Sequence, residues 1–79
     1  MYSNTHKTMA QAHVGDTVTV SDIHHTGVMK RRLTELGLTV GTKAKCVLKS
    51  FHGDMLMFVI RGACIAMRTC DLALIDIVT

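Results

Sequence analysis

The chain has 79 residues, of which 48% are apolar and 19% charged, and its formal net charge is +3. A chain this short forms one domain with a small core, and the mild positive charge permits an acidic partner without requiring one. It shows no secretory signal pattern and no apolar run near the roughly 18 residues of a membrane-spanning helix. Its three cysteines cannot all pair with one another. The reducing cytoplasm is therefore the expected location.

A helical turn and a strand are the first elements expected. Residues 1–7 are polar and without pattern, so a flexible segment is predicted in front of a domain that spans residues 8–79. One helical turn is predicted at residues 8–12. Residues 17–23 alternate threonine and valine and predict the first strand, in which a slip of the pattern at Asp22 indicates a bulge or the strand's end.

A short amphipathic helix is predicted over residues 27–36, with Thr26 as its N-cap. One side of this helix carries an apolar stripe that should face the core, formed by Met29, Leu33 and Leu36. Gly37 should end the helix in the left-handed region, and residues 39–42 predict a type II turn with glycine at its third position.

Four short runs in the rest of the chain predict strands, at residues 43–49, 55–61, 63–68 and 74–78. A hairpin connection at residues 51–54 joins the first two, and a helical turn at residues 69–73 precedes the last. The run at 55–61 is apolar on both faces, which indicates a central strand or one under a partner and favours self-association. Twelve strand residues are expected to point inward: Val18, Val20, Ala44, Cys46, Leu48, Leu56, Phe58, Ile60, Ile65, Met67, Ile75 and Ile77.

These elements predict a mainly β fold. Five short strands with tight links, and one short helix between the first and second of them, are typical of a small, partly closed barrel. An α+β sandwich is the alternative that the same order of elements allows.

Three blocks of the sequence resemble the FeoA family. Residues 30–42, Lys-Arg-Arg-Leu-Thr-Glu-Leu-Gly-Leu-Thr-Val-Gly-Thr, resemble the pattern R-L-x-E-L-G-L-x-P-G. Residues 59–68 resemble V-x-G-x-x-I-A-L-R, and residues 74–78 match a closing I-x-V strand. The turn at residues 14–17 corresponds to the family's P-G-D/E turn, so the resemblance extends over about residues 8–78.

The chain departs from these patterns at three positions. Val14 and Val40 stand where the family usually has proline, and Met67 stands where it has leucine. Proline stiffens a turn, so we expect slightly looser turns at the two valines and an unchanged fold.

The resemblance implies a five-stranded SH3-like barrel in the cytoplasm. FeoA proteins accompany FeoB, a membrane transporter of ferrous iron with a cytosolic G-protein domain, and are thought to bind its cytosolic part and assist uptake. The resemblance thus implies an accessory protein that its partner recruits to the inner face of the membrane. The same barrel occurs in iron-responsive repressors of the DtxR type, where it makes protein contacts, so the barrel alone does not declare a function.

The sequence carries no pattern of a catalytic site. It lacks G-x-x-x-x-G-K-[ST], G-x-G-x-x-G and H-E-x-x-H. A cysteine–histidine nucleophile is not indicated, because Cys46 and Cys64 are expected on opposite faces of their strands. We therefore expect a binding protein rather than an enzyme.

Histidines and cysteines are the candidate metal ligands. His24, His25 and His52, with Cys64 or Cys70, offer donors suited to Zn(II) or Fe(II). Adjacent histidines seldom aim at one ion, so no specific site is assigned. The sequence requires no cofactor and leaves weak Fe(II) or Zn(II) binding open.

Two kinds of partner fit the exposed residues. A basic surface is formed by Lys30, Arg31, Arg32, Lys43, Lys45 and Lys49, which makes a nucleic-acid-binding or metal-responsive regulatory module the alternative function. Nucleic acid is not favoured, because base stacking needs exposed aromatic rings and the chain has only Tyr2, Phe51 and Phe58. The favoured hypothesis is an apolar, Met-bearing docking face with a basic rim for a FeoB-like transporter, formed by Lys30, Arg31, Thr34, Phe51, Met55 and Met57.

Overall fold

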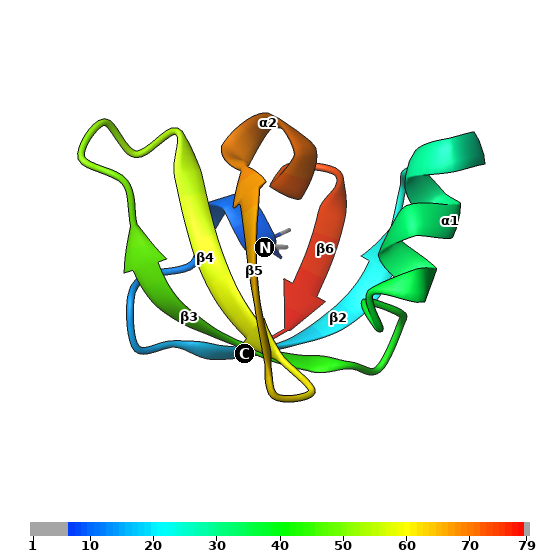
Figure 1. The fold of residues 1–79 in the computed structure, drawn as a ribbon, viewed down its shortest axis with the longest axis horizontal. Helices are drawn as coiled ribbons and strands as arrows, with labels where there is room; N and C mark the ends of the chain where they lie inside the picture. Colours follow the sequence, from blue (N-terminus) through cyan, green and yellow to red (C-terminus); the bar gives the residue numbers. More distant parts are fainter. Residues whose placement is uncertain (1–6, 79) are drawn as a thin grey trace, which may run out of the picture.

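The structure, a computed structural model, describes residues 7–78. A single antiparallel sheet dominates it, with the strand order β1-β6-β2-β3-β4-β5 (Figure 1). The elements in chain order are β1 (Lys7–Thr8), the 3-10 turn η1 (Met9–Gln11), β2 (Thr17–Ile23), α1 (Gly27–Glu35), β3 (Lys43–Lys49), β4 (Met55–Ile60), β5 (Ala63–Arg68), α2 (Thr69–Leu72) and β6 (Ile75–Val78). The flexible segment predicted at residues 1–7 lies outside the described residues, apart from Lys7, which begins β1.

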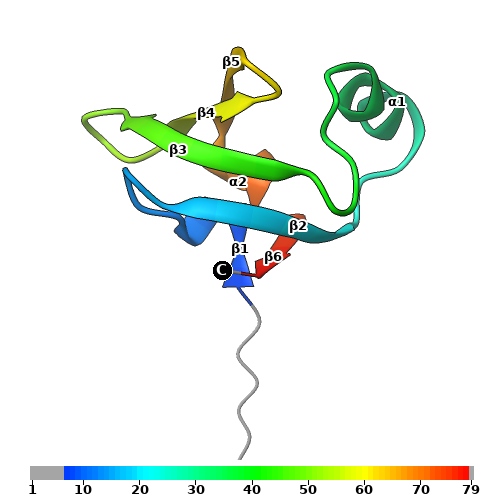
Figure 2. The same cartoon turned by 90° about the horizontal axis from the view of Figure 1, so that it is seen from below.

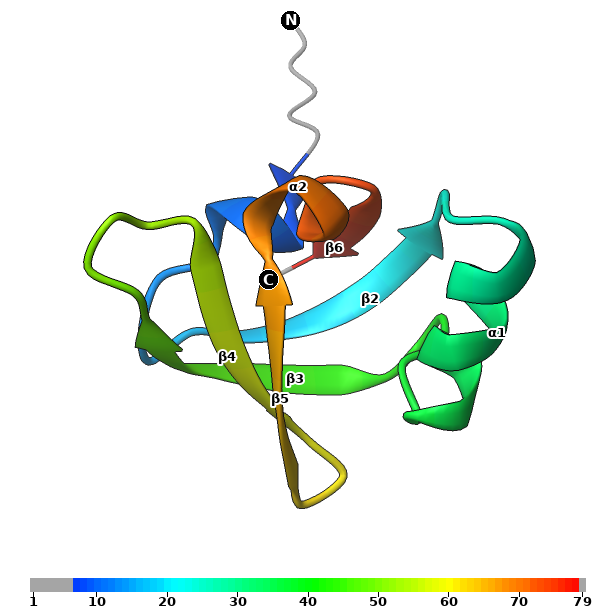
Figure 3. The same ribbon diagram turned by 45° about the horizontal axis from the view of Figure 1, so that its top comes forward.

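The sheet is open and has six strands, which corrects the predicted five-stranded barrel. Within residues 7–78 no strand pairing joins the two edge strands, β1 and β5. The added strand is β1, which places Lys7 opposite Ile77 and Thr8 opposite Asp76 on β6. A strand of two residues is too short to show alternation, so its sequence gave no signal. Helix α2 packs against η1 across one end of the curled sheet (Figure 3).

The core lies on the concave side of the sheet. Its buried apolar side chains are Met9, Ala12, Val18, Val20, Leu33, Leu38, Ala44, Cys46, Leu56, Phe58, Ile60, Leu72, Ile75 and Ile77. The alternation of β2 and β4 therefore predicted their inward faces correctly, and Ile65 and Met67 of β5 are partly buried against the same core. Residues 7–78 include no helix with the length and apolar character that crossing a membrane requires.

One inward assignment, Leu48, was wrong. Its side chain is 57% exposed. The β3–β4 register shifts between Cys46 and Leu48, so an extra residue reverses the alternation and puts Leu48 opposite Met57 on the outer face. A bulge has this effect because it leaves one residue unpaired.

Helix α1 ends as the sequence predicts. Gly37 has a φ of 90°, its N–H donates to the Thr34 carbonyl at 3.0 Å, and the Leu38 N–H donates to the Leu33 carbonyl at 2.9 Å. This pair of bonds is a Schellman motif, and it turns Leu38 back into the core. Leu36 was expected to face the core but is 42% exposed, because Leu38 occupies the inner position.

Candidate functional site

The predicted docking face divides into two separate surfaces. Lys30, Arg31 and Thr34 are exposed on α1, whereas Phe51 and Met55 lie at the β3–β4 hairpin. Strand β3 begins near α1 and ends at the hairpin, and its seven residues span roughly 23 Å. The helix and the hairpin accordingly lie at opposite ends of the molecule in Figures 1 and 2. The six predicted residues therefore do not form one continuous surface.

The hairpin end carries a group of apolar side chains, here called the Met face. It consists of Leu48, Phe51, Met55, Met57 and Ala66. The register places Leu48, Met57 and Ala66 in one row across β3, β4 and β5, and this row borders a hollow of about 210 Å³. Phe51, which is 96% exposed, follows Ser50 of the hollow's lining along the chain. The sequence supplied three of the five members, and the bulge in β3 added Leu48.

A second hollow, of about 290 Å³, lies between α1 and β5. Met29 and Leu36 line its helix side. Of the predicted apolar stripe, Leu33 is buried in the core, Met29 packs against it partly buried, and Leu36 is exposed. Arg32 and Arg68 also line it, and the Arg68 Nε atom lies 3.7 Å from the Asp71 carboxylate. Sequence reasoning missed this groove, because it depends on how α1 docks beside an edge strand.

The three candidate histidines lie apart. His25 is buried, and its Nε2–H donates to the Asp71 carbonyl oxygen at 2.7 Å, which makes it a structural contact. His52 is exposed at the hairpin, where its ring and that of Phe51 form a T-shaped pair with centroids 5.1 Å apart. The ring of His24 points toward Asp76, so the three imidazole rings do not share a site.

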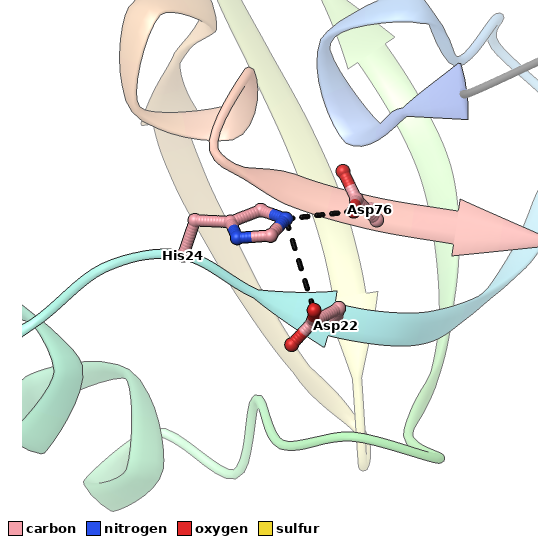
Figure 4. Close-up of side chains that lie close together, drawn as sticks. All are labelled: Asp22, His24 and Asp76. Carbon is pink, nitrogen blue, oxygen red and sulfur yellow. Dashed lines mark hydrogen bonds and ion pairs between the residues drawn. The ribbon is translucent and has the colours of Figure 1, made fainter.

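His24 instead meets two carboxylates that sequence reasoning missed (Figure 4). Its Nε2 atom donates a hydrogen bond to Asp76 Oδ2 at 2.7 Å and lies 3.8 Å from Asp22 Oδ2. The hydrogen bond to Asp76, followed by the negative charge of that carboxylate, raises the pKa of His24 above its usual value. The exposed Asp22 lies directly opposite the buried Asp76 in the pairing of β2 with β6.

A partial signal for this cluster was present in the sequence. Asp22 and His24 are two residues apart at the end of a strand, a spacing that puts both side chains on one face. Asp76 comes from β6, and its distant position along the chain concealed its proximity to them.

Among the described residues, no cysteine belongs to the group of possible metal ligands around His24. Cys46 is buried in the core, and burial raises the pKa of its thiol. Cys64 and Cys70 are exposed, and none of the three is in a disulfide. Cys64 pairs with Val59 on the outer face, so the expected opposite orientation of Cys46 and Cys64 is confirmed.

Comparison with known proteins places this fold among FeoA proteins. The family model described as "FeoA domain" matches residues 7–78. The solution structure of a FeoA protein from Chlorobium tepidum has a TM-score of 0.84 and 25% identity, with 90% of this chain and 68% of that chain covered. No curated protein matches the sequence.

Two further solved structures share the fold at lower identity. A FeoA-like protein from Clostridium acetobutylicum has a TM-score of 0.83 and 18% identity, covering 98% of this chain and 90% of that one. A manganese-dependent transcriptional repressor has a TM-score of 0.82 and 18% identity, covering 96% of this chain and 42% of that one. At such identity the likeness extends to the fold alone.

Proposed function

Because the chain belongs to the FeoA family, we propose that it is an accessory protein of ferrous iron uptake that binds the cytosolic part of a FeoB-type transporter. The role in iron uptake rests on the family match over residues 7–78. In this proposal the protein acts by binding at a surface, without a catalytic step of its own.

The observation that carries the binding proposal is the Met face. Exposed apolar surface that gathers in one place on a small domain is typical of an interaction site. Methionine side chains adapt their shape to a partner, and burial of one such side chain contributes about 1.5–3 kcal/mol. Met55 and Met57 therefore supply both fit and binding energy, and the neighbouring Phe51 offers an exposed aromatic ring.

The charges around the Met face indicate the character of the partner. Lys49 lines the hollow, and Arg68 lies opposite Met55 in the β4–β5 pairing. The acidic Asp54, which accepts a hydrogen bond of 2.7 Å from Ser50 Oγ, is outnumbered by these basic side chains. Lys45 is exposed on β3. A partner surface with an apolar centre and acidic rim would complement this arrangement. We propose that such a surface lies on the cytosolic G domain or on the C-terminal tail of the transporter.

A capture experiment tests the proposal. The cytosolic part of a FeoB-type transporter would be immobilised, and the wild type compared with the Met55→Asp, Met57→Asp double variant. The matched control is Val28→Asp, Val40→Asp, which adds the same charge at valines that are 76% and 63% exposed, on α1 and in the turn before β3. We expect capture of the wild type and the control and loss of the methionine variant.

Two further variants separate surface from stability. Phe51→Asp changes a side chain that is 96% exposed, so it should weaken capture while leaving the unfolding temperature unchanged. Lys30→Glu, Arg31→Glu tests the helix surface on its own. Equal capture of the wild type and both Met-face variants would refute the proposal, and loss of capture in the helix variant alone would move the binding surface to α1.

A further inference from the structure

Asp22, His24 and Asp76 place one ligand atom each within 4.8 Å of one another. Figure 4 shows the imidazole of His24 turned toward both carboxylates. From this arrangement we propose that the three side chains form a binding site for a divalent first-row transition-metal ion, of the Fe(II), Mn(II) or Zn(II) class. The proposal does not depend on the Met face or on the transporter.

Strand pairing builds the cluster. Asp22 and His24 are two residues apart where β2 ends, and Asp76 lies directly across from Asp22 on β6. A register shift between Val20 and Asp22 marks a bulge, a feature that re-aims side chains. The His24 N–H donates to the Leu74 carbonyl at 2.8 Å, which fixes the backbone beyond the strand. Donors held by paired strands keep their positions better than donors on a free loop.

The individual oxygen atoms are oriented for a shared ion. Asp22 Oδ1 accepts a hydrogen bond of 2.8 Å from the Ile23 N–H, and Asp22 Oδ2 lies 3.8 Å from His24 Nε2. Asp76 Oδ2 lies 2.7 Å from the same nitrogen. Metal–ligand bonds of 2.0–2.2 Å place adjacent donors about 3.0–3.5 Å apart. The two His24 distances bracket that range and all three donor atoms lie within 4.8 Å of one another, so shifts on the order of 1 Å would admit an ion.

The local charge favours a cation. Two carboxylates that face each other across neighbouring strands repel, and one of them, Asp76, is buried to 7% exposure. Burial of a carboxylate is costly unless positive charge and hydrogen bonds compensate it. His24 already donates a hydrogen bond to Asp76, and a bound divalent ion would add positive charge beside both carboxylates. It would replace the Nε2 proton of His24, and the neutral ring would keep its proton on Nδ1.

The donor set indicates the class of ion. One imidazole nitrogen and two carboxylate oxygens suit Fe(II), Mn(II) and Zn(II), whereas Cu(I) and iron–sulfur clusters prefer thiolates. Three protein ligands leave coordination positions for water, as in sites whose ion is open to exchange. The side chains of His24 and Asp22 are 48% and 61% exposed, so an ion can enter and leave from solvent. The geometry points to an exchangeable site rather than a structural one.

Mn(II) is the probe for the test, because its paramagnetism broadens NMR signals of nearby residues and it prefers oxygen and nitrogen to the exposed cysteine thiols. It would be titrated into the full ¹⁵N-labelled chain. We expect broadening at substoichiometric Mn(II) to centre on the amides of residues 22–24 and 75–77. Asp22→Asn and His24→Gln should each weaken binding at least ~10-fold, since the first removes a negative charge and the second removes the imidazole donor.

A matched control is available at the N-terminal side of β2. His13 Nδ1 lies 3.6 Å from Asp16 Oδ2, an exposed pair of the same residue types with no second carboxylate in the group. His13→Gln should leave Mn(II) affinity unchanged. Asp22 and His24 are exposed, so at alkaline pH, where the charge of His24 no longer contributes to stability, their variants should keep the wild-type unfolding temperature. No broadening at equimolar Mn(II), broadening centred on His13 or His52, or unchanged affinity in His24→Gln would overturn the site.

Discussion

Replacing Leu33 by alanine should release α1 from the sheet, whereas replacing Leu36 by alanine should leave it docked. Leu33 is 1% exposed and is the buried residue of this nine-residue helix. A helix this short is not stable alone, so it depends on that contact. A buried Leu→Ala change costs about 2–5 kcal/mol. Leu36 is 42% exposed in the groove beside β5, and its loss should cost less than about 1 kcal/mol.

Thermal and urea unfolding followed by circular dichroism would measure this difference. A loss of about 3 kcal/mol lowers the unfolding temperature of a domain this size by about 12–24 °C. The expected total stability of about 4–12 kcal/mol keeps such a variant measurable at least at low temperature. Leu33→Met, which preserves volume, is the control and should cost less than about 1.5 kcal/mol. Equal losses in Leu33→Ala and Leu36→Ala would refute the assignment of the two faces of α1.

Three other predictions follow from individual contacts. Gly37→Ala should lower the free energy of unfolding in a urea titration by about 1–2 kcal/mol. Gly37 has a φ of 90°, and the new methyl group would lie 3.0 Å from the Arg61 side chain. A loss below about 0.5 kcal/mol would contradict this expectation. Leu48→Lys should change the free energy of unfolding by less than about 0.5 kcal/mol. A loss above about 2 kcal/mol would contradict the outward orientation of Leu48 and indicate that its side chain lies in the core. Asp76 raises the pKa of His24. In metal-free protein the charged His24 therefore stabilises the fold, and this contribution is fully present below the usual histidine pKa of about 6.5. It disappears as the pH rises through the raised pKa of His24. Urea titrations of the wild type and His24→Gln should therefore differ most in acid, and a difference that grows with pH would contradict the pairing.

Local signals accounted for most of the fold. The end of α1 followed from Gly37, whose freedom to adopt a positive φ is a property of the residue itself. Gly41 likewise predicted the turn before β3, where it has a φ of 92° and the Thr42 N–H donates to the Thr39 carbonyl. Both features involve residues a few positions apart, so their sequence is sufficient to indicate them.

The features that the sequence did not reveal depend on pairing between distant segments. The outward position of Leu48 results from a bulge that is defined only against β4. Asp22 and Asp76 meet because β2 pairs with β6, although 54 positions separate them in the sequence. The residues of the predicted docking face lie on two surfaces for a similar reason, since the length of β3 separates α1 from the hairpin.

The central claim is that the Met face binds the cytosolic part of a FeoB-type transporter. The most direct measurement is an NMR titration of the ¹⁵N-labelled chain with that unlabelled partner. The account predicts that signal changes will concentrate at the hairpin and at the outward residues of β3, β4 and β5, including Met55 and Met57. Changes confined to α1 and β2, or no change at saturating partner, would contradict it.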